Sequence, residues 1–185
     1  MMPKPRAAAA PLERFFDECD VAECVTRLLD GASVFRLAAV SRRLRAAVFA
    51  NVTSLDLEST EVVDLAPLAS LTNLKVLDVE GTSVADLAPL ASLTNLEVLD
   101  VEGTSVADLA PLAGLTKLFY LDLAHTKIAD LAPLAGLTNL GYLNIEGTSV
   151  ADVAPLAGLT ELMSLIARNT EVANLAPLAG LTNLG

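Results

Sequence analysis

Apolar residues recur through most of the chain at a spacing that fits neither one long helix nor one long strand. In residues 93–114 the recurring aliphatic side chains are Leu93, Leu96, Leu99, Val101, Val106, Leu109 and Leu112. Residues 98–102 alternate apolar and polar positions, which predicts a short strand with Leu99 and Val101 pointing inward. Residues 108–112 are too few for an amphipathic α-helix. With Asp108 as the N-cap and Pro111 in the first turn, they predict a 3₁₀ or single-turn helix on the outer wall.

This pattern belongs to a 22-residue block that the chain repeats several times. Block 71–92 differs from block 93–114 at only two positions, where Lys75 stands against Glu97 and Ser92 against Gly114. More divergent copies begin at residues 115, 137 and 159, a degenerate first copy covers 49–70, and a seventh copy begins at residue 181. A fixed period of this length predicts a solenoid, in which each block buries its apolar face against its neighbours.

The sequence of the block resembles the repeat pattern of a known family. The run LTNLEVLDVEGTSV resembles the leucine-rich repeat pattern LxxLxxLxLxxNxL, and LAPLAGLTNL resembles the linker of internalin-type repeats. The resemblance implies an α/β solenoid with a parallel concave sheet and short 3₁₀ or one-turn helices on the convex side. It also implies an interaction scaffold rather than an enzyme. Threonine replaces the family's ladder asparagine, and we expect its hydroxyl to bond the backbone of the neighbouring turn; the positions are Thr60, Thr82, Thr104, Thr126, Thr148 and Thr170.

The segment before the repeats has a different character. Residues 1–11 are expected to form a flexible tail, and residues 12–48 show helical spacing of apolar positions. We expect these helices to cap the apolar end of the solenoid, which then occupies residues 49–185 with about six repeats and the start of a seventh.

The same segment also resembles an F-box. The resemblance rests on the run VTRLLDGASVFRLAAVSRRLRAAVFANVTSLDL, and it implies a hydrophobic surface for the Skp-type linker of a cullin ubiquitin ligase. That surface would consist of Leu12, Leu28, Leu29, Leu37 and Val40. The segment departs from the family pattern because the opening Leu-Pro dipeptide is reversed as Pro11-Leu12. A plain helical cap remains the alternative.

Charge divides the chain into two unequal parts. Residues 1–50 carry eight Lys or Arg and six Asp or Glu, net +2, whereas residues 51–185 carry four and seventeen, net −13. Phosphate binding needs clustered Lys and Arg, so no nucleic acid partner is expected for the repeats, and a basic protein is the expected partner. Mean hydropathy is +0.53, yet no run of about 18 apolar residues exists, so no membrane span is expected.

The predicted strands place equivalent residues of successive repeats in columns on the concave side. We expect a partner-binding face that is acidic towards its N-terminal half and aromatic in the middle. Its residues are Asp56, Asp78, Asp100 and Asp122, then Glu58, Glu80, Glu102 and Glu146, and finally Phe119, Tyr120 and Tyr142. Stacked like charges repel, and a basic ligand would relieve that repulsion. Two alternatives remain: duplication of an acidic, well-solvated strand, and calcium binding, which a flat strand face without loop carbonyls serves poorly.

Few residues support chemistry. His125, the only histidine, replaces a turn glycine, and no nucleophile or phosphate-binding arrangement accompanies it, so we expect no enzyme, no cofactor and no metal. The aspartates at 64, 86, 108, 130 and 152 are expected to be structural caps. Cys19 and Cys24 are expected to be reduced.

The ends of the chain leave the cellular setting open. The start MMPKPRAAAAP is too short for the core of a signal peptide, which favours a cytoplasmic or nuclear protein. The alternatives are an internalin-like surface or receptor-binding protein, which would need export, and a regulatory fragment of a larger multidomain protein, since the last repeat stops at Gly185.

Overall fold

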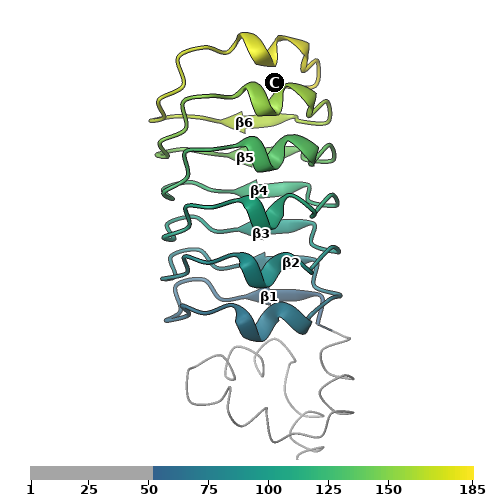
Figure 1. The fold of residues 1–185 in the computed structure, drawn as a ribbon, viewed down its shortest axis with the longest axis vertical. Coiled ribbons are helices and arrows are strands. Elements are labelled where there is room, and N and C mark those ends of the chain that lie inside the picture. The colour runs from purple at the N-terminus through teal and green to yellow at the C-terminus, as the bar shows by residue number, and fades with distance from the viewer. Residues whose placement is uncertain (1–51) are drawn as a thin grey trace, which may run out of the picture.

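Each repeat makes one turn of a solenoid, with a three-residue strand on one wall and a short 3₁₀ helix on the other (Figure 1). The computed structural model describes residues 52–185. The strands are β1 (Ser54–Asp56), β2 (Val76–Asp78), β3 (Val98–Asp100), β4 (Tyr120–Asp122), β5 (Tyr142–Asn144) and β6 (Ser164–Ile166). The 3₁₀ helices are η1 (Ala66–Ser70), η2 (Ala88–Leu90), η3 (Ala110–Leu112), η4 (Ala132–Gly136), η5 (Ala154–Gly158) and η6 (Ala176–Gly180).

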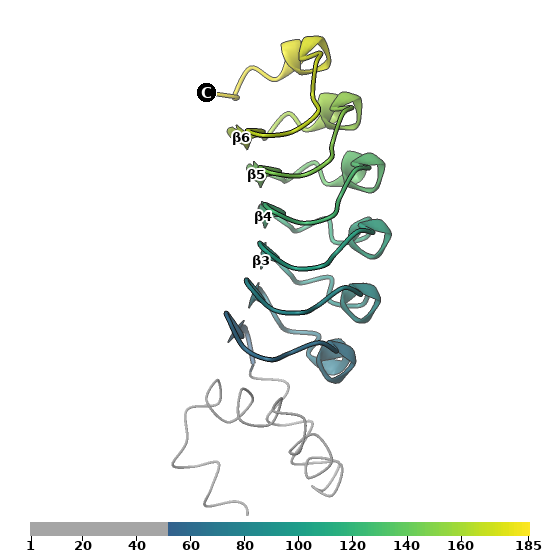
Figure 2. The ribbon, with the colours of Figure 1, turned by 90° about the vertical axis from the view of Figure 1, so that its left-hand side faces the viewer.

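The six strands form one parallel sheet in chain order. Figure 2 shows the sheet on the inside of a gentle bend and the 3₁₀ helices on the outside. The predicted solenoid with a concave parallel sheet is therefore confirmed. None of the helices in residues 52–185 has the length and apolar character needed to cross a membrane.

Several predictions lie outside the described residues. They concern the tail at 1–11, the helical cap or F-box-like segment at 12–48 and the first three residues of the solenoid, 49–51. The expected linker surface of Leu12, Leu28, Leu29, Leu37 and Val40 falls in this part of the chain, as do the two cysteines.

The core follows the repeat. The aliphatic positions that the pattern predicts as inward are at most 1% exposed in the third described turn: Leu93, Leu96, Leu99, Val101, Val106, Leu109 and Leu112. Their equivalents in the neighbouring turns join the same hydrophobic cluster. Because Leu77, Leu99 and Leu121 are paired in register, each leucine packs between the matching leucines of the turns on either side. The stability of a turn therefore depends on its neighbours.

The start of each 3₁₀ helix differs by one residue from the prediction. Asp108 was expected at the N-cap, but Leu109 occupies that position. Asp108 still accepts a hydrogen bond through Oδ1 from the Ala110 N–H at 2.8 Å, so it satisfies one of the free donors at the helix start. The arrangement recurs at Asp64, Asp86, Asp130, Asp152 and Asn174. The five aspartates are therefore structural, as predicted, and Asn174 plays the same part in the last described repeat.

The threonine ladder was predicted wrongly. The Thr104 hydroxyl donates to the Val101 carbonyl at 2.7 Å, inside its own repeat rather than to the neighbouring turn. The bond recurs at Thr60, Thr82, Thr126, Thr148 and Thr170. Backbone groups connect the turns here instead, as where the Gly103 N–H donates to the Ala124 carbonyl at 2.9 Å.

A side-chain ladder between turns does exist, at a position that the sequence analysis missed. The side-chain amide of Asn95 donates to the Thr72 carbonyl of the preceding repeat at 2.8 Å. Asn139 and Asn183 repeat this bond at 2.7 and 2.9 Å. The sequence signal for this ladder is the asparagine of the recurring LTN triplet.

Candidate functional site

The predicted columns lie side by side on the strand wall. Register pairs connect Asp56 to Asp78, Asp78 to Asp100 and Asp100 to Asp122, and we call these four residues the aspartate column. The Glu58, Glu80 and Glu102 residues follow two positions later, and we call them the glutamate column. Backbone bonds from Ser59 to Glu80 and from Gly81 to Glu102, both 2.8 Å, hold these turns against each other.

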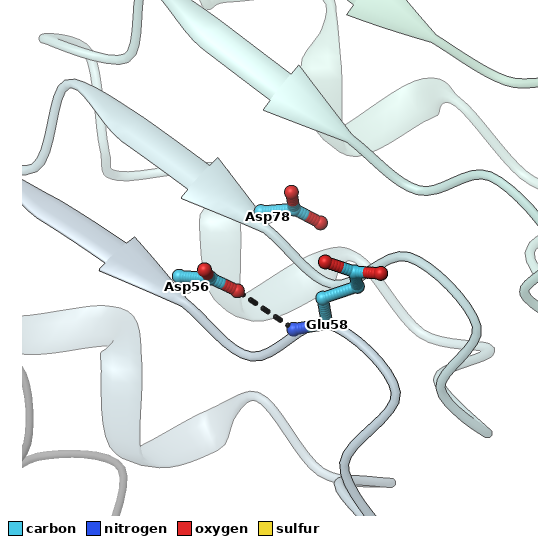
Figure 3. Close-up of side chains that lie close together, drawn as sticks. All are labelled: Asp56, Glu58 and Asp78. Atoms are coloured by element: carbon cyan, nitrogen blue, oxygen red, sulfur yellow. Dashed lines mark hydrogen bonds between the residues drawn. The ribbon is translucent and has the colours of Figure 1, made fainter.

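One oxygen of each aspartate in the column is used by the fold. The Oδ1 atoms of Asp56, Asp78 and Asp100 accept from the N–H two residues further on, at 2.9 to 3.0 Å. Figure 3 shows this bond between Asp56 and Glu58, beside the carboxylate of Asp78. The bond orients each carboxylate and leaves its second oxygen for other contacts.

Carboxylates crowd together at the end of β1, β2 and β3. One oxygen from each of Asp56, Glu58 and Asp78 lies within 4.8 Å of the others, and the same holds for Asp78, Glu80 and Asp100. Two like charges about 4 Å apart repel by about 1 kcal/mol in water. In residues 52–185 the one salt bridge joins Lys75 to Glu97 at 2.8 Å, away from the aspartate column. The cluster is therefore not neutralised by cations of the described repeats.

Burial and crowding change the protonation of this surface. Burial, followed by the charges of Asp122, Asp78 and Glu80, raises the pKa of Asp100 from 3.8 to about 6, although the hydrogen bond from the Glu102 N–H acts to lower it. The pKa of Glu80 is also raised, by burial first and then by Glu102 and Glu58. The surface therefore gains protons on mild acidification.

Asp122 differs from the other aspartates. It is buried, its Oδ1 accepts from the Ala124 N–H at 2.9 Å, and its Oδ2 accepts from the Asn144 amide at 3.0 Å. The Tyr120 hydroxyl also approaches Oδ2 at 3.5 Å. Both oxygens of Asp122 therefore accept hydrogen bonds within the fold, whereas the sequence analysis expected this residue on the partner-binding face.

Aromatic side chains adjoin the acidic columns. The rings of Tyr120 and Tyr142 stack with centroids 4.4 Å apart and planes within 2° of parallel. Phe119 is 46% exposed and lies over Gly141, where an added Cβ would overlap the ring. Met163, 50% exposed, follows Gly141 in the same column and was not predicted as part of the face. The absence of a side chain at Gly141 is the sequence signal that Phe119 could extend across the next repeat.

The acidic clusters are also the groups in residues 52–185 that could hold a metal ion. Each provides three carboxylates, whereas calcium takes about six to eight oxygen ligands. The strand wall contributes its carboxylates from one side, so each group alone leaves the shell incomplete.

His125 lies at the turn position that glycine occupies in other repeats. Its φ of 57° matches the 66° to 68° of Gly81, Gly103 and Gly147, so this turn requires the left-handed region in each of these repeats. The side chain is exposed and packs near Gly147, away from the acidic clusters. It completes the turn, as the sequence predicted.

The comparisons agree with this architecture. A family model described as Leucine Rich repeats (2 copies) matches residues 72–114. The solved structure of internalin C2 from Listeria monocytogenes is 37% identical over 75% of this chain and 62% of that chain, with a TM-score of 0.73. This chain is a leucine-rich repeat protein.

Two further structures share the repeat architecture. An internalin, inlF, from Listeria monocytogenes is 28% identical over 96% of this leucine-rich repeat chain and 57% of its own, with a TM-score of 0.65. A leucine-rich repeat protein from Leptospira interrogans, at 19% identity, covers 72% of this chain and 35% of its own with a TM-score of 0.64, and shows the fold alone. The leucine-rich repeat chain thus spans about three fifths of the internalin structures. No curated protein matches it.

Proposed function

We propose that the repeats form a non-enzymatic scaffold that binds a basic polypeptide on the strand wall. The observation that carries the proposal is the solvent-accessible part of the aspartate column, Asp56, Asp78 and Asp100, whose carboxylates stand in register without cations from the described repeats beside them. A partner with Lys or Arg side chains would replace repulsion between carboxylates with attraction. The neighbouring Tyr120, Tyr142 and Phe119 would add apolar contact area, because aromatic residues are enriched at protein interfaces.

The remaining acidic residues provide a matched control. Asp86 and Asp108 carry the same charge as Asp78 and Asp100 but lie beside the 3₁₀ helices on the opposite wall. Asparagine keeps the structural hydrogen bond on both walls, since Asn144 and Asn174 already make it in later repeats, at 3.0 and 2.9 Å. Two pairs of Asp→Asn changes therefore alter net charge equally and preserve both turns.

Affinity capture with the immobilised chain tests the proposal. The wild-type chain and the Asp86→Asn/Asp108→Asn variant should retain the same basic proteins from a cell extract, and the Asp78→Asn/Asp100→Asn variant should lose them. If all three chains capture the same proteins, the acidic columns are better explained as a well-solvated strand surface that was copied by duplication of the repeat.

The proposed scaffold has two candidate forms, which differ in where in the cell they would work. The F-box-like run in residues 12–48 supports a substrate adaptor of a cullin ubiquitin ligase, which would work in the cytoplasm or nucleus. Recovery of a Skp-type linker and a cullin from a eukaryotic extract, lost when Leu28 and Leu29 are changed to Ser, tests that form. The 37% identity to internalin C2 favours the second form, an internalin-like surface protein, and export of the natural protein into the culture medium or cell envelope tests it.

A further inference from the structure

The tyrosine stack ends on the side of β3, where the Asp100 carboxylate lies two residues along the neighbouring strand. Strand β4 lies between β3 and β5, and the Tyr120 ring packs against Tyr142 of β5. The opposite face of Tyr120 therefore turns towards β3. Its hydroxyl approaches Asp122, two residues along its own strand, so the ring extends from the Val98 column across to the aspartate column.

The neighbouring repeat has a smaller side chain at the equivalent position. Val98 is the register partner of Tyr120, and its side chain is much shorter than a tyrosine. Asp100 is the register partner of Asp122, and it is half-buried with Oδ1 engaged by the Glu102 N–H. No residue among 52–185 hydrogen-bonds to its second oxygen. The Tyr120 ring extends beyond the shorter Val98 side chain, and the Asp100 carboxylate lies beside them. We call these three neighbouring groups the step.

We infer that this step receives an arginine side chain of the partner, with the guanidinium stacked on Tyr120 and paired with Asp100. The inference rests on the proposed function and names the residue that the surface selects. A guanidinium is planar and delocalised, so it can lie on an aromatic face while its N–H groups donate to a carboxylate at the edge. A lysine ammonium is a compact, strongly hydrated charge and fills such a step less well.

The other end of the stack does not offer the same chemistry. The outer face of Tyr142 turns towards Ser164, and the residues beside it in the aspartate register are Asn144 and Ile166. Within residues 52–185 the aspartate register carries no carboxylate at this end, and the carboxylate of that repeat is Glu146, four positions beyond Tyr142. The charge of the step therefore selects one end of the stack, and a partner chain would be placed in one register along the wall.

Two peptides of equal charge separate this inference from the proposed function. Nona-arginine and nona-lysine, each fluorescently labelled, would be titrated with the whole chain at one ionic strength and followed by anisotropy. We expect nona-arginine to bind at least threefold more tightly. Both tyrosines of the chain lie in the stack and the chain has no tryptophan, so tyrosine ring signals in proton NMR should shift with nona-arginine more than with nona-lysine.

The decisive variant is Tyr120→Val/Tyr142→Val, which restores the residue that Val76 and Val98 supply in the same column. It should bring the two affinities within a factor of about 1.5, mainly by weakening nona-arginine. Asp100→Asn should also reduce the ratio, and the matched Asp86→Asn should leave it unchanged. Equal affinities for the wild type, or a preference that survives in the tyrosine variant, would overturn the inference while leaving the proposed function standing. Failure of both peptides to bind would overturn both.

Discussion

Asp78 and Asp100 stand opposite each other in register on neighbouring parallel strands, and with Glu80 they bring carboxylate oxygens within 4.8 Å. Like charges in such positions destabilise a sheet. The buried leucines Leu77 and Leu99, paired one position earlier on the opposite face, hold the strands together against this repulsion. The surface thus carries an electrostatic cost that a bound cation would lower.

Asp100→Asn should stabilise the protein at neutral pH. The folded-state pKa of Asp100, about 6, exceeds its ordinary 3.8, so the ionised carboxylate opposes folding above pH 6 and this opposition fades as the pH falls through that value. After allowance for its partial exposure, the variant should gain about 1 kcal/mol of unfolding free energy at pH 7. Urea denaturation at pH 7 and pH 4 measures the effect.

The difference between Asp100→Asn and wild type should shrink towards zero at pH 4, where the folded wild-type carboxyl is protonated. Asp86→Asn, which removes the same charge on the opposite wall, is the matched control. A constant difference across this pH range would mean that Asp100 does not titrate near pH 6.

Thr104→Val should destabilise the solenoid although valine has nearly the same shape. The Thr104 hydroxyl is buried and donates to the Val101 carbonyl at 2.7 Å, so its loss removes a hydrogen bond from the core and should cost about 1 kcal/mol. Thr60→Val removes the same bond at an exposed position and should cost less than half as much. Equal losses in thermal or urea unfolding would contradict the role assigned to burial.

Leu99→Ala should cost about 2 to 5 kcal/mol, because Leu99 is fully buried between Leu77 and Leu121. Leu165 holds the same position in β6 but is only partly buried, so Leu165→Ala should cost markedly less. Hydrogen exchange should show faster opening around each changed turn. A loss of equal size at both sites would show that neighbours on both sides do not determine the stability of a turn.

Much of this structure could be predicted from the period of the sequence. Once the repeats coil in register, the positions of Leu99 in the core and of Asp78 beside Asp100 on the surface follow directly. These predictions need only the sequence spacing between equivalent residues. The near-identical second and third blocks establish that spacing.

Details that depend on contacts between different repeats could not be read in this way. Asp122 is buried because Asn144 and Tyr120 surround its Oδ2, and both residues depart from the common repeat. Thr104 has a hydroxyl that could reach either its own turn or the next, and only the backbone path decides in favour of Val101. The helix start shifted from Asp108 to Leu109 because an aspartate can cap from one residue earlier.

The most direct test of the account is the affinity of nona-lysine for the two pairs of asparagine variants at low ionic strength. Each pair removes two negative charges, so a response to net charge alone would be equal. If the strand wall is the docking surface, Asp78→Asn/Asp100→Asn should weaken binding at least fivefold, and Asp86→Asn/Asp108→Asn by less than twofold. Equal weakening by the two pairs would contradict a localised recognition surface on the concave sheet.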